Sequence, residues 1–343
     1  MIEGFDNSTL MAAAGGVALT AVLVVGMAVW ANRQRFTHDV EQITKLRRKR
    51  ALDYKAASAE YKKFRKKIES GNTILIDLIH DLGDDFVGRD SAQQQIAFDE
   101  AFEAVASIRQ ANERTRIVVV LHTLGGYARP AHMIALALKH HIGKAKGHYN
   151  PRKAPRVIAY VPYVAMSGGT MIALAADQVG LDGTASLGPI DTVYGGFPTE
   201  AYKDLLEQKG ALATQDVLVM LAHEAEKYDR YASKVAREIV NPAHRDGSRP
   251  EHFLADHLSS GTLSHSQAIS PEEAKELGMN VTTKIPSEIY GLVDARIRMI
   301  NTRLEHEDGE QGSDAPQPRD DPEGAEQVLE HAIRQSLRGG LRF

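Results

Sequence analysis

The sequence YVPYVAMSGGTMIALAADQV, residues 160–179, joins two apolar runs through Ser167 and two glycines. The first run is typical of a buried strand, and the alanine-rich second run is typical of a buried helix. A strand that turns through glycine into a helix is the unit from which parallel α/β sheets are built. Ser167 lies at that turn, where its hydroxyl could cap the helix or act as a nucleophile.

Similar units precede and follow this stretch. Short β-branched runs alternate with helical patterns, which predicts an α/β fold with a mostly parallel sheet and right-handed crossovers. The expected strands are residues 73–79, 116–122, 156–162 and 178–182, and the expected helices are about 91–112, 128–142, 168–177, 199–240 and 270–278.

Two glycine pairs follow expected strands: Gly125 with Gly126, and Gly168 with Gly169. Ligands collect at the carboxyl ends of parallel strands, where glycine turns expose backbone N–H groups. The Gly126 and Gly168 amides are therefore candidates for an oxyanion hole beside Ser167, as acyl transfer requires. The simpler interpretation is that the glycines allow tight turns and that Ser167 caps a helix.

The order of these motifs resembles one family. A strand ending in LHTLGG, a strand ending in YVPYVAMSGGT, and the later segments AADQVGLDGTASLGPID and SHSQAISPEEAKELGM are similar to the serine dehydrogenase proteinase family. That family is membrane-associated, belongs to the ClpP/crotonase superfamily and is related to signal peptide peptidase A. The resemblance covers about residues 72–290. It implies a superhelix of repeated βαβ units, a polypeptide substrate, a serine peptidase activity and a homo-oligomer.

The sequence offers several candidates for the base that would activate Ser167. ClpP peptidases carry a histidine about 25 residues after the serine, but here the stretch is SLGPIDTV, with Asp191 and no histidine. Signal peptide peptidase A and its relatives use a lysine farther along, and the resemblance favours Lys209 in LEQKG over Lys203. A lysine base must be neutral, which requires a depressed pKa.

Two histidines remain alternatives for the base. His122 precedes the first glycine pair, and His265 lies in LSHSQAI, near the substrate groove that the resemblance implies. Each could replace lysine or orient the substrate, although a structural hydrogen bond is the simpler role.

A main-chain mode of substrate binding is also expected. The backbone from Gly125 through Tyr127 to Ala128 would pair with an extended peptide, as in related peptidases. Gly169 and His265 complete the predicted substrate-binding set.

The N-terminal region predicts a membrane anchor. Residues 9–31 carry no charge and are long enough to cross a bilayer as one helix. The tail before them contains Glu3 and Asp6 but no basic residue, which argues against a cleaved signal peptide. Arginines and lysines follow the span, so the positive-inside rule places the catalytic domain in the cytoplasm and the N-terminus outside, with membrane lipids as partners.

A basic helix is expected after the span. Tyr54, Ala57, Tyr61, Phe64 and Ile68 form an apolar seam on it, which either packs on a partner or belongs to a solvated helix near lipid head groups. The predicted segments are a tail (1–8), a transmembrane helix (9–31), a basic juxtamembrane helix (32–71), a ClpP/crotonase-like peptidase domain (72–300) and an acidic, disordered tail (301–343).

Composition narrows the chemistry further. The 343 residues include no cysteine, which excludes disulfides, zinc thiolate sites, iron-sulfur clusters and a cysteine nucleophile. No metal-binding spacing, cofactor or nucleic-acid partner is predicted. The sequence favours a membrane-anchored serine endopeptidase; the alternatives are a crotonase-like acyl-CoA hydratase or hydrolase, and a non-catalytic membrane scaffold.

Overall fold

The computed structural model describes residues 42, 44–82, 95–144, 150–194, 197–245 and 247–307. The predicted transmembrane helix, residues 9–31, lies outside the described residues. Within the described ranges, no helix combines the length and apolar character needed to span a bilayer. Residues 57–301 of the described chain form one compact unit, and residues 42–56 and 302–307 fall in another.

The centre of the larger unit is a parallel sheet of five strands. In spatial order they are β1 (Thr73–Ile79), β2 (Arg116–His122), β3 (Val157–Val161), β5 (Gln178–Leu181) and β9 (Val281–Thr282). Every neighbouring pair is parallel. The strands β1 and β2 have the predicted bounds, and the predicted α/β class with a parallel sheet is confirmed.

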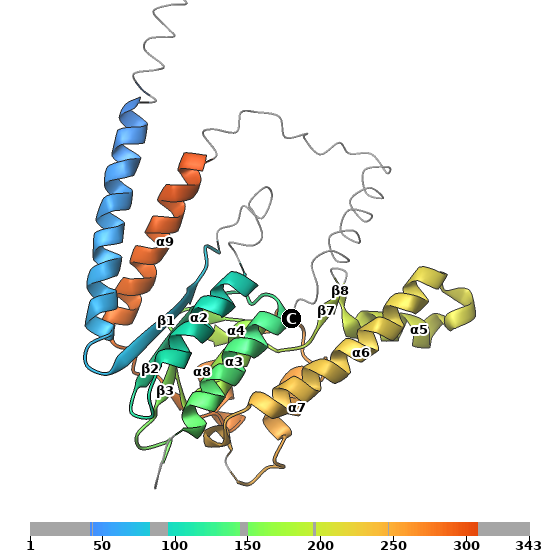
Figure 1. Cartoon of the computed structure of the whole chain (residues 1–343). Coiled ribbons are helices and arrows are strands. Elements are labelled where there is room, and N and C mark those ends of the chain that lie inside the picture. The colour runs from blue at the N-terminus through green and yellow to red at the C-terminus, as the bar shows by residue number, and fades with distance from the viewer. Residues whose placement is uncertain are drawn as a thin grey trace, which may run out of the picture. The chain divides into compact units, whose positions relative to one another are not determined.

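One face of the sheet is covered by helices α2 (Phe98–Gln110), α3 (Ala128–Gly143), α4 (Gly168–Ala175) and the inner part of α6 (Asp216–Ile239). Figure 1 shows α2, α3 and α4 side by side on this face. All eight residues of α4 are buried. The apolar run that follows Ser167 is therefore a core helix, and it holds the turn that carries Ser167 rigidly against the sheet.

The opposite face is covered by residues 57–68 of the N-terminal helix and by α9 (Ser287–Glu307). Tyr61, Phe64 and Ile68 pack there against buried residues of the sheet and α9. Gly291 of α9 allows the close approach, because a Cβ atom there would lie 2.4 Å from the Phe64 ring.

Two predictions about the ends of the domain are therefore wrong. Residues 57–68 are neither a solvated helix nor a surface awaiting a partner, because Tyr61, Phe64 and Ile68 pack, half-buried, against their own domain; Tyr54 of the same seam is 39% exposed. The predicted disordered tail begins too early, because α9 continues through residues 301–307.

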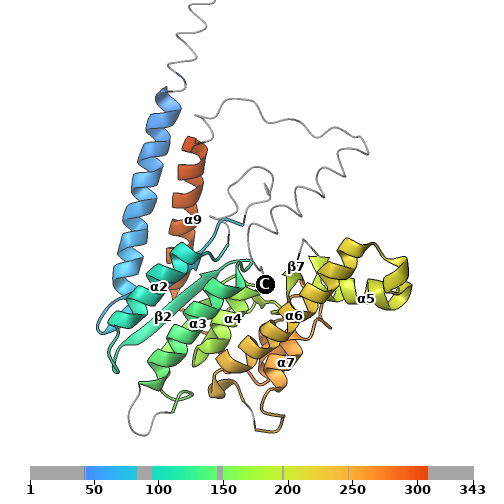
Figure 2. The same cartoon turned by 45° about the vertical axis from the view of Figure 1, so that its right-hand side comes forward.

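The long helical segment expected at residues 199–240 forms an arm. It consists of α5 (Thr199–Lys209), the 3-10 turn η2 (Ala211–Ala213) and the outer part of α6, and it extends beyond the sheet (Figure 2). The strands β7 (Val193–Tyr194) and β8 (Phe197–Pro198) connect it to the core, and η3 (Pro242–His244) and α7 (Phe253–Ser259) follow. The predicted serine cap is confirmed at Ser270, which forms a capping box at the start of α8 (Pro271–Glu276).

A small second layer lies beside the glycine turns. The strand β4 (Val164–Ala165) pairs in parallel with β6 (Ser186–Leu187), and Leu187 also pairs antiparallel with Ile269. These pairings bring together three segments that are distant in the sequence and that carry the predicted site.

Candidate active site

Ser167 lies at the turn from β4 into α4, in a conformation that is costly for any residue except glycine. Its φ is 51° and its ψ is −113°, and it is the one non-glycine residue with positive φ in the described ranges. The side chain is 1% exposed, and its Oγ has no hydrogen-bond partner among the described residues. Ser167 occupies the N-cap position of α4 without forming a side-chain cap. The helix-capping interpretation is therefore wrong, and the hydroxyl is left free for another role.

The first glycine turn packs directly against Ser167. A Cβ atom on Gly125, whose φ is 109°, would lie 2.8 Å from the Cβ of Ser167. Ile96 holds the other side of this turn, because its N–H donates to Gly125 O at 2.9 Å and its carbonyl accepts from Tyr127 N–H at 3.0 Å. Gly126 lies between these two bonds, so its own N–H and C=O point away from Ile96.

The two amides that the sequence nominated for an oxyanion hole lie close together. The Gly126 nitrogen is 3.6 Å from the position that a Cβ atom of Gly168 would occupy. Gly168 is the first residue of α4, where an N–H group has no acceptor within the helix. In the described part of the chain, the Gly126 N–H donates to no other group. Two unpaired donors beside Ser167 and the positive end of a buried helix suit a developing negative charge.

A histidine and a carboxylate form a pair near the same turn. His265 Nδ1 lies 2.9 Å from Asp191 Oδ1, and the Asp191 side chain is 5% exposed whereas that of His265 is 29% exposed. The antiparallel pairing of Leu187 with Ile269, continued along both segments, places Asp191 opposite His265. The sequence analysis named His265 for substrate binding and as an alternative base, and noted Asp191 only because a histidine was missing there.

This pair belongs to the layer that supports Ser167. The Thr170 hydroxyl of α4 accepts from Gly188 N–H at 3.1 Å, and a Cβ atom on Gly188 would lie 2.6 Å from Met166 Cε. Since β4 and β6 run in parallel, Ser167 and Asp191 both follow the carboxyl ends of paired strands. No hydrogen bond joins Ser167 to His265 in the described chain. Catalytic hydrogen bonds are often long until substrate is bound.

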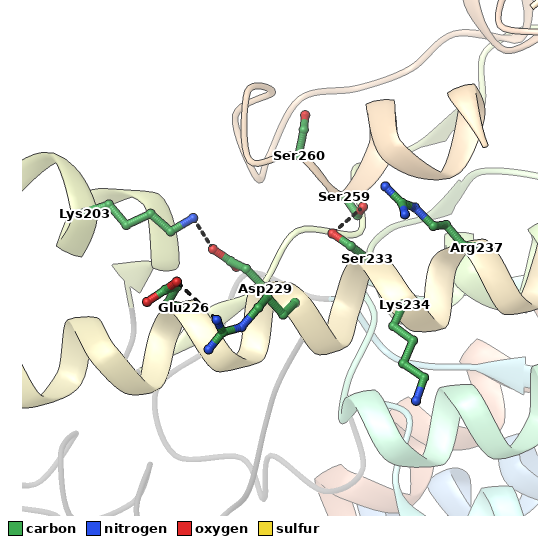
Figure 3. A pocket seen from close by; sticks show the side chains of 9 residues that line it. Lys203, Glu226, Asp229, Ser233, Lys234, Arg237, Ser259 and Ser260 are labelled. Atoms are coloured by element: carbon green, nitrogen blue, oxygen red, sulfur yellow. Dashed lines mark hydrogen bonds and ion pairs between the residues drawn. The ribbon is translucent and has the colours of Figure 1, made fainter. Parts of the chain in front are cut away.

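Neither predicted lysine has the surroundings of a neutral base. Lys203 forms ion pairs with Asp229 and with Glu200, the second at 3.0 Å. Burial alone would lower the pKa of Lys203, but its hydrogen bonds to Asp229 and Glu200 outweigh burial and raise the pKa. Figure 3 shows Lys203 reaching Asp229 across a cavity of about 530 Å³ between α5, α6 and α7. Lys203 is therefore a cation with structural partners.

Lys209 is the last residue of α5, is exposed, and forms no ion pair or hydrogen bond with any described residue. The structure brings it into contact with neither Ser167 nor the glycine turns within the described chain. Its predicted role as the base has no support in the contacts of a single chain.

His122 faces the other side of the sheet. Its ring packs edge-on against Tyr163 with centroids 5.5 Å apart, and its Nδ1 is buried without a described partner. Burial is the main cause that lowers the pKa of His122 to about 4. It is a neutral core residue and not a partner of Ser167.

The predicted peptide-pairing backbone is shorter than expected. The Tyr127 N–H is already bonded to Ile96, and Ala128 is fully buried at the start of α3. Gly169 donates to Met166 O at 2.8 Å, and a Cβ atom on it would lie 2.6 Å from Thr123 Cγ2, so this glycine allows close packing. The Gly126 N–H, by contrast, donates to no described group.

The site has no arrangement that suits a metal ion. Among the residues that the structure describes, no three or more histidine, aspartate or glutamate side chains come together as metal ligands would.

Comparisons with known proteins identify the family of the chain. The family described as ClpP-like SDH-type serine proteinase matches residues 48–306. Two uncharacterized proteins of Methanocaldococcus jannaschii are similar to the chain. One is 35% identical over 208 residues, covering 61% of this chain and 68% of the relative. The other is 32% identical over 199 residues, covering 58% of this chain and 63% of the relative. Among solved structures, ClpP1 from Listeria monocytogenes aligns over 66% of this chain and 97% of its own length, with 14% identity and a TM-score of 0.35.

Proposed function

The chain belongs to the ClpP-like SDH-type serine proteinases, and we propose that it is a serine endopeptidase in which Ser167 attacks the peptide carbonyl. One observation carries this proposal: a buried serine hydroxyl with no hydrogen-bond partner among the described residues, held at φ 51° beside two amides that donate to no described group. Backbone strain of this kind costs about 1–3 kcal/mol and persists where function requires it. A serine with a purely structural role would not need that conformation.

We propose His265 as the general base, in place of the predicted Lys209. The Asp191 carboxylate accepts a hydrogen bond from Nδ1–H of His265. In a neutral His265 the free lone pair is therefore on Nε2. Nε2 would take the proton from Ser167 as the Oγ–C bond forms, and would return it to the leaving amine as the peptide C–N bond breaks. Asp191 stabilises the imidazolium that exists between these steps. Water then hydrolyses the acyl-enzyme by the same sequence.

Gly126 and Gly168 would donate their N–H groups to the tetrahedral oxyanion. Their proximity supports a shared target, and removing one such donor typically costs about 10²- to 10³-fold in kcat. A Cβ atom on Gly126 would lie 2.3 Å from Ile96 N, so the glycine also permits the bridge that orients its amide.

The test is peptide hydrolysis by the purified full-length protein and its variants. Ser167→Ala, and His265→Ala by the same reasoning, should each lower kcat by about 10³-fold or more. Asp191→Asn should have a large effect as well, because the wrong tautomer of His265 becomes favoured. Lys209→Ala should keep full activity, and His140→Ala, at an exposed site on α3, is the matched histidine control.

Each other outcome assigns a different mechanism. Full activity of Ser167→Ala would refute the nucleophile, and a fluorophosphonate that labels the wild type but not Ser167→Ala would exclude the acyl-CoA hydratase alternative. If Lys209→Ala is inactive while His265→Ala is active, the base is the lysine. If no variant changes the cellular phenotype, the scaffold alternative is favoured.

We also propose that residues 9–31 anchor the protein in a membrane, with the catalytic domain in the cytoplasm, and that it works as a homo-oligomer. The uncharged span and the basic residues that follow it support the anchor. Full-length protein should sediment with membranes and a chain starting at residue 42 should not; co-sedimentation of the shortened chain would contradict the anchor. The mass of the detergent-solubilised protein tests the oligomer.

A further inference from the structure

We propose that Thr123, His80 and Glu100 form a buried hydrogen-bond chain that positions the Gly125–Gly126 peptide for oxyanion binding. These side chains do not touch the reacting atoms in this assignment. They act through Gly125, and so are positioning residues. The inference rests on the proposed function and adds to it residues that neither the motifs nor the family match assigned.

The chain begins at the end of β1. His80 follows that strand directly and is 2% exposed. Its Nε2 lies 3.1 Å from both carboxylate oxygens of Glu100 on α2, and its Nδ1 lies 2.7 Å from the Thr123 hydroxyl. A carboxylate cannot donate, so Nε2 carries a proton, and in a neutral ring Nδ1 is then the acceptor. The tautomer of His80 follows from Glu100, and His80 orients the hydroxyl of Thr123.

Thr123 passes this orientation to the glycine turn. Its side chain is fully buried, and its Oγ1 accepts from Gly125 N–H at 3.0 Å. Oγ1 also lies 3.2 Å from Gly125 O, to which the hydroxyl can donate, so the Thr123 side chain contacts both the amide and the carbonyl of Gly125. The backbone of Thr123 is also held, because its N–H donates to Val164 O at 3.1 Å and its O accepts from Met166 N–H at 3.0 Å.

Gly125 needs this support because, among the described residues, its N–H has no acceptor other than the Thr123 hydroxyl. It has no side chain, and its φ of 109° is a conformation that other residues avoid. Ile96 holds the carbonyl side of Gly125, and Thr123 holds the amide side. The two bonds together fix the peptide planes on either side of Gly125, and one of these planes contains the Gly126 N–H.

Loss of this positioning should affect oxyanion stabilisation and leave substrate binding intact. A Gly126 N–H that is displaced or rotated still permits substrate to bind, but it stabilises the oxyanion less well. Loss of the Thr123 hydroxyl should therefore lower kcat and leave KM nearly unchanged. Substitution of a residue with only a structural role would lower stability, and it would not lower kcat selectively while leaving KM unchanged.

Two substitutions at Thr123 separate the hydroxyl from the shape of the side chain. Thr123→Val keeps the shape, including the methyl group that packs on Gly169, but removes the hydroxyl. Thr123→Ser keeps the hydroxyl and removes the methyl group. We expect Thr123→Val to lose about 10- to 100-fold in kcat and the same factor in affinity for a peptide aldehyde, which forms a tetrahedral adduct with the serine. Thr123→Ser should remain within about threefold of wild type.

A second variant covers the outcome in which Thr123→Val does not fold. Glu100→Gln acts at the partly exposed end of the chain, where the side chain is 29% exposed, and it can reverse the tautomer of His80 by donating to Nε2. We expect a smaller loss of kcat, with KM retained, and an unchanged melting temperature would separate that loss from unfolding. Glu103→Gln, on an exposed residue of the same helix, is the matched control.

The outcomes that overturn this inference differ from those that overturn the peptidase. If Thr123→Val and Glu100→Gln keep wild-type kcat and aldehyde affinity while Ser167→Ala is inactive, the positioning chain is wrong and the peptidase stands. If Thr123→Ser is as impaired as Thr123→Val, the methyl contact is what matters and the inference fails. If Ser167→Ala hydrolyses peptide at the wild-type rate, the proposed function fails by itself.

Discussion

Replacing Ser167 should make the protein more stable as it becomes inactive. The residue combines a strained backbone, with φ 51° and ψ −113°, and a buried hydroxyl without a described partner. Both features cost free energy in the folded state. Ser167→Ala removes only the hydroxyl, whereas Ser167→Gly removes the hydroxyl and relieves the backbone.

The two contributions are of similar size. An unsatisfied buried polar group costs about 1–3 kcal/mol, so Ser167→Ala should raise the free energy of unfolding by about 1 kcal/mol or more. Backbone strain costs about 1–3 kcal/mol, and the extra flexibility of glycine in the unfolded chain offsets about 0.4–1 kcal/mol of the relief. Ser167→Gly should therefore be about 1 kcal/mol more stable than Ser167→Ala.

The measurement is urea-induced unfolding of the three proteins, followed by circular dichroism at one protein concentration, with peptide hydrolysis in parallel. The expected order of stability is Gly, then Ala, then Ser, and both variants should be inactive. If Ser167→Gly is less stable than Ser167→Ala, the strain argument is wrong. If Ser167→Ala is less stable than wild type, the hydroxyl has a partner that stabilises the fold.

Other predictions concern the packing and titration of the same domain. Gly291→Ala should destabilise the domain by about 1–3 kcal/mol, because the added Cβ would lie 2.4 Å from Phe64; an unchanged urea midpoint would contradict this. Burial lowers the pKa of His122 to about 4, so the unfolded chain binds a proton between about pH 6.5 and 4 that the native chain does not, and stability should fall as pH falls through that window. His122→Phe should lose less stability than wild type between pH 7 and pH 5, and an equal loss in thermal unfolding would show that His122 does not titrate in this way. Thr170→Val removes the hydroxyl that accepts from Gly188 N–H and donates to Ala165 O, so it should lower both kcat and stability, the latter by about 1–2 kcal/mol. If Thr170→Val has the wild-type kcat and the wild-type free energy of unfolding, the Thr170 hydroxyl does not support the site.

Local patterns in the sequence were sufficient for four strands of the sheet and for the serine turn, but they missed β9 and α9. The strands 73–79 and 116–122 were predicted with the observed bounds, because a buried parallel strand needs a continuous β-branched run. Ser167 and the glycine pairs were found in the same way, since a tight turn depends on neighbouring residues.

Sequence reasoning favoured Lys209 as the base, with His265 kept as an alternative, and it did not pair His265 with Asp191. Asp191 and His265 are 74 positions apart, and nothing in either segment indicates the other. Only the pairing of Leu187 with Ile269 brings them together. His80 was also missed, although it follows a predicted strand at the same carboxyl edge, a position that could have drawn attention to it.

The sequence by itself determined four strands of the sheet, the helix after Ser167 and the turn that carries Ser167, because those depend on short-range patterns of apolar residues and glycine. Only the tertiary structure decided which polar groups meet: His265 with Asp191, Thr123 with His80, and Lys203 with Asp229. It also decided that Tyr61 and Phe64 pack, half-buried, against their own sheet and α9. The physical reason is that burial and hydrogen bonding are set by chain segments distant in sequence, and those contacts determine which side chains are free to react.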